Sequence, residues 1–262
     1  MAIQMVSVGK TATGSQTVAR ALAVLELLGR EGELGVRELG RQLGVAPSIA
    51  QRLINTLSEA GFVEKSLGNS KWKIGYKAFQ IGSAFLASTD LNAATAPELH
   101  LLAEQHQVNS FLGVLRSQDV VYLATVQSGG PISITNAPGS RTYLHSTALG
   151  KALLLDSSDD EVQALLGTGP LKQLTKKTKR SVSAVLKDLK EGRRLGYVVC
   201  DEENLENVFA VGAPIRDASG GIIAALSGAV PRQRLSARAI EELCELVKAS
   251  ATRASRRLGS LK

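Results

Sequence analysis

The spacing of apolar residues early in this sequence constrains the fold more than any other feature. Val36, Leu39 and Leu43 recur at intervals of three and four residues, as they would on the buried face of a short helix. Gly44 then interrupts the period where a tight turn is needed. Pro47 suits the first position of a second helix, because its missing N–H would have no partner there. We therefore expect two helices joined by a turn.

The second helix has an apolar face and a polar face. Its apolar residues lie three and four apart, and Gly61 follows where a left-handed cap would end the helix; they are Ala50, Leu53, Ile54 and Leu57. The other face has no carboxylate before Glu59 and consists of Ser48, Ile49, Gln51, Arg52, Asn55 and Thr56. Such a face tolerates a polyanion, whereas a solvated helix more often pairs Glu with Lys. Taken alone, it fits a DNA-contacting helix and a plain surface equally well.

Two short alternating runs follow, at 62–65 and 71–76, on either side of a polar turn at 66–70. This arrangement is typical of the wing of a winged helix-turn-helix. We expect a basic, flexible wing tip that contacts phosphates or the minor groove, through Asn69 and Lys71. An earlier helical stripe would complete a three-helix core, and it consists of Val18, Ala21, Leu22, Leu25 and Leu28. The predicted hairpin and the preceding helix, on either side of the two helices, favour the DNA-binding interpretation.

Composition is that of a globular protein large enough for two cores. The chain has 262 residues, of which 44% are hydrophobic and 21% charged, and its net charge of +7 favours polyanionic partners. Residues 172–194 hold nine Lys or Arg against two acids. We interpret that run as a solvated loop and helix face, with a second nucleic-acid contact as the alternative.

Neither a metal site nor a disulfide framework is indicated. Cys200 and Cys244 are 44 residues apart, with no CxxC spacing and no neighbouring histidine. His100 and His106 are six apart and do not share one face of a helix. No secretory signal and no apolar run of membrane-spanning length is present, so we expect a cytoplasmic protein with no membrane partner and no cofactor.

The second half of the chain mixes strands and helices. We expect a linker helix at 77–88, a polar joint at 89–96, and a helix opened by Pro97 with a stripe of Leu99, Leu102, Ala103 and His106. Expected strands are 108–116, 120–126, 132–137, 197–200, 208–215 and 222–230. Further expected helices are 147–155, 159–166, 182–194 and 236–258. The pattern predicts an α+β fold, with an antiparallel sheet covered by helices.

Two possible catalytic or phosphate-binding motifs lack the residues that such motifs require. The segment 149–152 is not the end of a phosphate-binding loop, because His145 and Ala152 replace the residues that such a loop needs. Ser227 lacks the flanking glycines of a hydrolase nucleophile. His145 with Arg141 and Lys151 could form a catalytic cluster. We favour instead an anion-binding turn at a helix start capped near Thr147.

Three motifs carry a family resemblance that covers residues 16–258. Segment 16–76 resembles the winged helix of IclR-type bacterial transcriptional regulators, and 139–154 is similar to that family's central loop and helix. The family signature at 196–217 is matched by Gly196, Glu203, Ala210, Val211, Gly212, Ile215 and Asp217. Cys200 stands where the pattern has an acid or serine, and Arg216 where it has an aromatic residue or histidine.

The resemblance implies a winged helix-turn-helix at 16–76, a linker helix and joint at 77–92, and an effector-binding α/β domain of GAF or profilin-like fold at 93–262. It also implies double-stranded, palindromic operator DNA as a partner, and a homodimer or homotetramer. On the linker helix, Phe79, Ile81 and Phe85 could form an interface or belong to the core of their own domain.

The resemblance further implies an effector pocket lined by Ile134, Ala148, Leu149, Cys200, Ala210, Ser227 and Ala229. We add Arg141, His145 and Thr147 around the start of the central helix. The implied lining is small and mostly apolar, with one hydroxyl and one thiol. It predicts an aromatic or larger organic acid, with its carboxylate at the helix N-terminus near Thr147.

We therefore predict a ligand-responsive, DNA-binding regulator of a catabolic or metabolic operon, with no catalytic or metal-binding residues. One alternative is a small-molecule-modifying enzyme domain fused to a winged helix. Another is a protein-interaction module that has lost ligand binding.

Overall fold

The computed structural model describes residues 14–87, 90–130, 134 and 136–260. Contacts divide the chain into two compact units, Met1–Ser88 and Thr89–Lys262. Each unit has its own hydrophobic core, so we describe the two separately. No helix among these described residues is long and apolar enough to cross a membrane.

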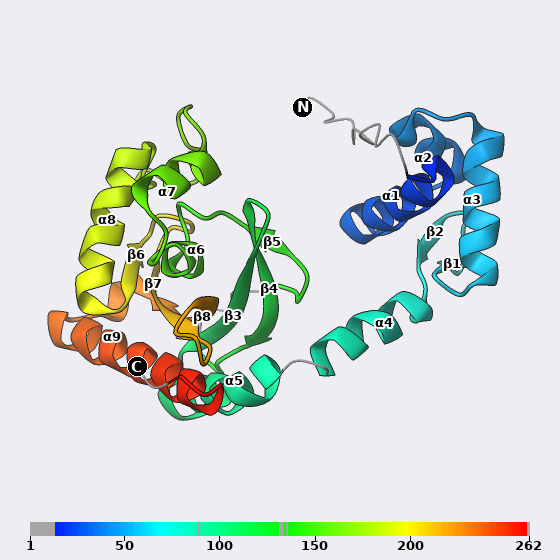
Figure 1. Ribbon diagram of the computed structural model, residues 1–262. Helices are drawn as coiled ribbons and strands as arrows, with labels where there is room; N and C mark the ends of the chain where they lie inside the picture. Colours follow the sequence, from blue (N-terminus) through cyan, green and yellow to red (C-terminus); the bar gives the residue numbers. More distant parts are fainter. Residues whose placement is uncertain (1–13, 88–89, 131–133, 135, 261–262) are drawn as a thin grey trace. The chain divides into compact units, whose positions relative to one another are not determined.

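The N-terminal unit is a three-helix core with a two-stranded hairpin (Figure 1). Its elements are α1 (Gln16–Glu31), α2 (Val36–Leu43), α3 (Pro47–Glu59), β1 (Val63–Lys65), β2 (Trp72–Ile74) and α4 (Tyr76–Ala87). Gly44 adopts the left-handed conformation that ends α2, and Pro47 begins α3. The predicted helix-turn-helix and hairpin are confirmed.

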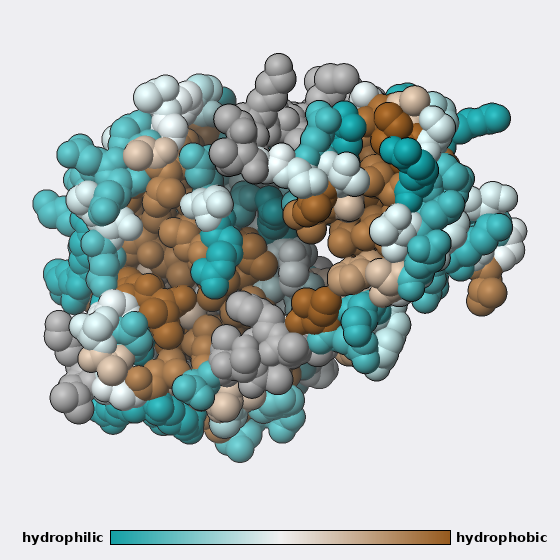
Figure 2. Space-filling view, turned by 45° about the vertical axis from the view of Figure 1, so that its right-hand side comes forward, coloured by the Kyte–Doolittle hydropathy of each residue, from teal (hydrophilic) through white to brown (hydrophobic). Residues whose placement is uncertain are grey.

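The predicted stripe on α1 is partly wrong. Val18 and Leu22 are 57% and 56% exposed, and the residues of α1 that enter the core are Val24, Leu27 and Leu28. Helical spacing offers both sets, and contact with α2 and α3 selects the one nearer the C-terminal end of α1. Hydrophobic side chains therefore appear on the surface of this unit among hydrophilic ones (Figure 2).

Helix α4, which the sequence predicts as a linker, also exposes hydrophobic side chains. Tyr76 and Phe79 are 66% and 65% exposed, and their rings lie 5.8 Å apart. Ile81 is exposed as well, so neither Phe79 nor Ile81 belongs to the core of its own unit. The side chain of Phe85 lies outside the part that the structure describes.

The C-terminal unit is built on an antiparallel sheet, as predicted, whose described strands lie in the order β5-β4-β3-β8-β7-β6; β5 was not among the expected strands. The strands are β3 (Asn109–Arg116), β4 (Asp119–Val126), β5 (Arg141–Thr142), β6 (Val198–Asp201), β7 (Val208–Arg216) and β8 (Ile222–Pro231). The strand expected at 132–137 falls largely on residues outside the described ranges.

Helices cover both faces of this sheet (Figure 1). One core joins the sheet to α6 (Ala148–Leu153), α7 (Asp159–Leu166) and α8 (Val182–Leu195). The other joins it to α5 (Asp90–His100), the π-helical turn Leu101–Gln105 and α9 (Ala237–Arg257). Alternate residues of β8 serve the two cores, with Ala225 and Ala229 on the α6 side and Leu226 on the α9 side.

The predicted boundary at Pro97 is wrong. Helix α5 already begins at Asp90, and Pro97 lies inside it. Tertiary contacts outweigh the helix-breaking tendency of proline here. Leu99 packs in the core shared with α9, and Glu98 accepts charge-assisted hydrogen bonds from Arg253 and Arg257 of α9 at 2.6 and 2.9 Å.

Candidate functional site

The polar face of α3 is exposed, as its sequence predicts. Ser48, Gln51, Arg52, Asn55 and Thr56 are accessible, whereas the opposite face packs into the core of the N-terminal unit. Within this face, Gln51 Nε2 donates a hydrogen bond to Asn55 Oδ1 at 2.7 Å. These two side chains therefore act as one polar unit one helical turn apart.

Ile49 is half-buried: it packs against the core of the N-terminal unit and also lines a surface hollow together with Arg52.

The wing differs from the expectation at its tip. Asn69 Oδ1 accepts a hydrogen bond from the Lys71 backbone N at 2.8 Å, and Asn69 Nδ2 donates one to Glu33 at 3.1 Å. Asn69 thus organises the turn, while the Lys71 side chain is exposed. The tip is not basic: its outermost side chain is Leu67, which is 98% exposed, and the lysines stand on its flanks.

Two surface hollows connect α3 with its neighbours. One is lined by residues of α2, α3 and the wing: Gly35, Val36, Arg37, Gln51, Lys65, Ser70 and Trp72. The other joins α1 to α3 and includes Thr17, Arg20, Arg52 and Thr56. Arg20 and Arg37 were not among the predicted contacts. Both are basic residues on helices that flank α3. Their basic character and their place on these helices could have marked them as candidate DNA contacts.

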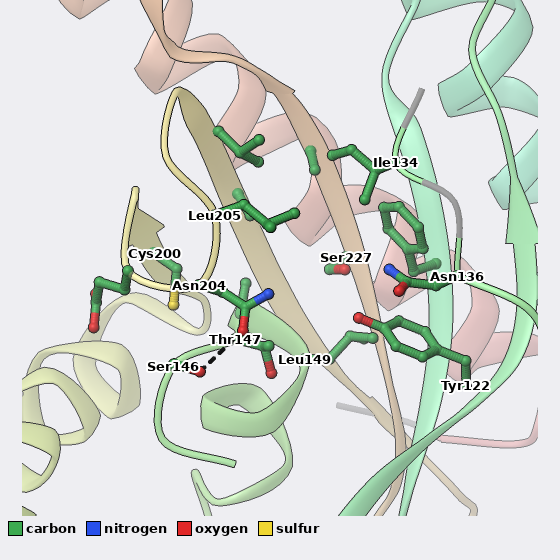
Figure 3. A pocket seen from close by; sticks show the side chains of 16 residues that line it. Tyr122, Ile134, Asn136, Ser146, Thr147, Leu149, Cys200, Asn204, Leu205 and Ser227 are labelled. Carbon is green, nitrogen blue, oxygen red and sulfur yellow. Dashed lines mark hydrogen bonds between the residues drawn. The ribbon is translucent and has the colours of Figure 1, made fainter. Parts of the chain in front are cut away.

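A cavity of about 50 Å³ lies in the C-terminal unit between α6 and one face of the sheet (Figure 3). Its lining consists of Phe111, Tyr122, Ile134, Asn136, Ser146, Thr147, Ala148, Leu149, Cys200, Glu203, Asn204, Leu205, Val208, Ala210, Ser227 and Ala229. We call this space the effector cavity, after the pocket that the sequence predicts. It exceeds the volume that a single water needs.

Small residues in register create the space. Cys200 pairs with Ala210 across β6 and β7, and Ala210 pairs with Ala229 across β7 and β8. Directly paired residues share one face of a sheet, so these three side chains form a row. In the next row, Gly212 lies beside Ser227. A Cβ atom at Gly212 would stand 2.2 Å from the Ala148 carbonyl oxygen, so glycine lets α6 begin directly on β7.

Thr147 caps the start of α6, as predicted. Its Oγ1 accepts a hydrogen bond from Gly150 N at 3.0 Å and donates one to the Tyr143 carbonyl at 2.7 Å. The hydroxyl is therefore committed to the cap. Helix α6 has only six residues, so the dipole at its start is that of a short helix.

Arg141 and His145 lie outside the effector cavity, unlike the other predicted lining residues. Arg141 is exposed and bound to Asp119 at 3.0 Å. His145 is buried, and its Nε2 lies 2.9 Å from the Lys172 carbonyl. Burial lowers the pKa of His145, and the nearby ammonium of Lys151 acts in the same direction.

The cavity is more polar than the sequence suggested, because the prediction missed Tyr122, Asn136, Ser146 and Asn204. Ser146 Oγ donates a hydrogen bond to Asn204 Oδ1 at 3.1 Å, and no described residue accepts one from Asn204 Nδ2. Tyr122 and Asn136 extend from the opposite side toward Asn204 (Figure 3). Burial raises the pKa of Tyr122, so its hydroxyl stays protonated.

A buried ion cluster supports the wall that carries Asn204. Lys151 is fully buried, and its Nζ lies 2.8 Å from Glu203 Oε1 and 2.6 Å from Asp188 Oδ2. Burial by itself would lower the pKa of Lys151, but the carboxylates of Glu203 and Asp188 outweigh it and the pKa is raised. Asp188, expected in a solvated face, is therefore a partner of a buried lysine.

The candidate catalytic residues Cys200, Lys151, Arg141 and His145 are not arranged as a catalytic site. Burial raises the pKa of Cys200 to about 12, so the thiol is neutral and a poor nucleophile. Lys151 is held by its carboxylates and Arg141 is at the surface, so the possible cluster with His145 is not assembled. Within the described ranges, no group of three His, Cys, Asp or Glu residues could hold a metal ion.

Comparisons with known proteins identify a family for both parts of the chain. The family model "IclR helix-turn-helix domain" matches residues 17–66, and "Bacterial transcriptional regulator IclR C-terminal" matches residues 83–256. The chain is 30% identical over 234 residues to the HTH-type transcriptional regulator BhcR of Paracoccus denitrificans, which covers 89% of this chain and 84% of the relative.

Two solved structures share the fold. A putative transcriptional regulator from Rhodococcus aligns with a TM-score of 0.83 at 26% identity, over 95% of this chain and 100% of that one. An IclR homologue from Microbacterium hydrocarbonoxydans, complexed with 4-hydroxybenzoate, aligns with a TM-score of 0.82 at 22% identity, over 92% and 98%.

The matched proteins are transcriptional regulators rather than enzymes, with a DNA-binding helix-turn-helix and a ligand-binding C-terminal domain. The prediction of a regulator is thereby confirmed. The chain belongs to the IclR family of bacterial transcriptional regulators.

Proposed function

We propose that this protein regulates a catabolic or metabolic operon in response to an organic acid, and that Asn204 recognises the acid. In this proposal residues 16–76 bind DNA and residues 93–262 bind the effector. Residues 77–92 connect these two domains. A DNA-binding regulator of a bacterium works beside the chromosome, so we place the protein in the cytoplasm.

The single observation that carries the effector proposal is the placement of Asn204. Ser146 fixes its carbonyl end, which leaves the Nδ2 donor for a ligand oxygen. Tyr122 offers a second donor from the opposite side, while Phe111 and Ile134 provide apolar walls. Two polar ends and an apolar middle suit an aromatic acid with a ring hydroxyl.

We place the carboxylate at Asn204 rather than at the N-terminus of α6. The Thr147 hydroxyl is already used by the cap, and a six-residue helix attracts anions weakly. The 4-hydroxybenzoate bound by the Microbacterium relative combines a carboxylate with a ring hydroxyl. It is therefore the first compound to test.

Calorimetry on the full chain with 4-hydroxybenzoate, benzoate and glyoxylate tests this proposal. Asn204→Ala should weaken binding of the hydroxylated acid about tenfold, the value of one hydrogen bond to a charged group. Glu206→Ala is the matched control, because Glu206 lies in the same loop but does not line the cavity. Tight binding of glyoxylate with no binding of either benzoate would contradict the proposal.

For DNA, we propose that α3 enters the major groove of a palindromic operator. Ser48, Gln51, Arg52, Asn55 and Thr56 would face the bases or phosphates, and Lys71 would contact the backbone. A palindrome requires two copies of the chain. The exposed hydrophobic side chains of α4 are our candidate for part of a homodimer interface.

Light scattering of wild type and Phe79→Ser tests the interface. A smaller oligomer for the variant supports it, and an unchanged mass contradicts it.

Regulation would then be a shift between two arrangements of the oligomer. The effector binds one arrangement better, and α4 passes that preference to the spacing of the two DNA-binding units. A change in operator affinity on adding the effector measures the coupling.

A further inference from the structure

The hairpin β1–β2 ends in an unusual side chain for a turn. Residues 66–70 are Ser, Leu, Gly, Asn and Ser, and Leu67 is 98% exposed. Turns of this kind are dominated by polar residues and glycine. Leu67 contributes nothing to the core of its unit. A single exposed leucine is common on protein surfaces, so its position and its support decide what it means.

The turn holds Leu67 in a defined place. Ser66 N donates to the Lys71 carbonyl at 2.9 Å, and Lys71 N donates to Asn69 Oδ1 at 2.8 Å. Gly68 has a φ of +83°, a conformation that glycine adopts without strain. Asn69 also binds Glu33, which ties the turn to the segment between α1 and α2. The leucine is therefore presented by an ordered backbone.

The wing shares a surface with the polar face of α3. Gln51 of α3 lines the same hollow as Lys65 and Ser70 at the base of the turn. Any duplex that contacts Gln51 therefore passes along the wing as well.

Charges around the tip suit a nucleic acid. Lys65 and Lys71 flank the turn and are exposed, and together with Lys73 they outnumber the two nearby carboxylates, Glu33 and Glu64. Glu33 binds Asn69, and Glu64 lies 3.1 Å from Lys73. This excess of positive charge beside an apolar tip favours contact of the hairpin with a phosphate backbone.

We propose that Leu67 enters the minor groove of the operator as an apolar wedge, beside the major groove that receives α3. This inference rests on the proposed DNA-binding role of α3. The minor groove is about 6 Å wide, too narrow for a helix but open to a hairpin tip. Its walls are deoxyribose faces, which an aliphatic side chain can contact. Apolar side chains in this groove partly unstack a base step and bend the duplex.

The test uses the full chain and a duplex that the wild-type protein recovers from a random-sequence pool. Affinity is measured by fluorescence anisotropy at several salt concentrations, and bending by energy transfer between dyes at the duplex ends. Leu67→Ser should bind about tenfold more weakly, which is the value of burying one leucine side chain, and should bend the duplex less. Leu67→Met should retain both properties, because it keeps an apolar chain of similar size.

The salt dependence separates this contact from a phosphate contact. Leu67→Ser should keep the wild-type slope of log affinity against log salt concentration, because an apolar contact releases no counterions. The matched control Lys71→Ala should lower that slope by about one. Thermal unfolding of Leu67→Ser should equal that of wild type, since the side chain is exposed.

Three results would overturn the proposal. Leu67→Ser could bind and bend the duplex as wild type does. Leu67→Lys could bind more tightly with a steeper salt slope, which would place the tip on the phosphates. Leu67→Ser could change the oligomeric mass without changing the bend, which would place the leucine against another copy. Failure of the wild-type protein to recover any duplex would instead overturn the DNA-binding role, and this contact with it.

Discussion

The ammonium group of Lys151 is held by both carboxylate oxygens of Glu203, at 2.8 and 2.9 Å, in the interior of the C-terminal unit. Lys151 belongs to α6, and Glu203 lines the effector cavity one residue before Asn204. The pair therefore connects α6, which borders the cavity, to the loop that carries Asn204, the proposed recognition residue. A third partner, Asp188, extends the link to α8.

Replacing Lys151 with methionine should lower the free energy of unfolding by about 3–5 kcal/mol. The substitution leaves two carboxylates facing each other without their cation, one of them buried. Urea denaturation followed by circular dichroism measures the change. The control is Lys177→Ala, which removes an exposed ion pair with Glu202 and should leave stability unchanged. Equal stability of wild type and Lys151→Met would contradict the buried pair.

Alkaline pH should destabilise the protein through Cys200. The pKa of its thiol is about 12 in the folded protein, against an ordinary value of 9.0. Below pH 9.0 both folded and unfolded chains keep the proton. Above it the unfolded chain loses the proton first, so stability falls as pH rises.

Urea unfolding at about pH 8 and about pH 10 tests this. Wild type should lose more stability between the two than Cys200→Ser, whose hydroxyl does not titrate, by on the order of 1 kcal/mol. Equal losses would show that the thiol is not held in its neutral form.

Arg52→Ala should weaken operator binding by about 1–3 kcal/mol while the fold persists. Arg52 is exposed on α3 and lines the hollow between α1 and α3, so its guanidinium is available to a base or a phosphate. A mobility-shift titration gives the affinity. Arg30→Ala is the control, because Arg30 is also an exposed arginine but lies in the last turn of α1, next to Glu31. The same affinity for both variants would remove α3 from its proposed role.

Ala210→Leu should abolish effector binding and leave DNA binding intact. Ala210 lies between Cys200 and Ala229 in the row of small side chains, so three added carbon atoms enter the cavity directly. Calorimetry with the effector and anisotropy with operator DNA measure the two activities separately. Retained effector binding would show that the ligand does not occupy this space.

Regular elements could be predicted from the sequence because their period is local. The bounds of α2 and the start of α3 follow from apolar spacing and from Gly44 and Pro47. The sequence could not show which face of α1 is buried, since Val18 and Val24 belong to two equally regular apolar stripes. Packing of α2 and α3 against one stripe decides between them. The start of α5 was wrongly predicted at Pro97 for the same reason, because tertiary contact with α9 decides where α5 begins and ends.

The cavity was harder to predict than the fold. Asn136 and Asn204 lie in loops, where no period indicates which way a side chain points. Lys151 would ordinarily be read as a surface residue. Its burial depends on Asp188 and Glu203, which are 37 and 52 positions away along the chain. Only the folded arrangement of α6, α8 and the loop after β6 reveals that they meet.

The row of Cys200, Ala210 and Ala229 has a consequence for how such a protein can diversify. The three side chains project from neighbouring strands of a continuous sheet, whose backbone hydrogen bonds do not depend on their identity. The hydrogen-bonding groups stand elsewhere, on Asn204, Asn136 and Tyr122. In the proposed binding mode, point mutations in this row would change the length of ligand that fits the cavity, while the side chains proposed to bind its polar ends would stay in place.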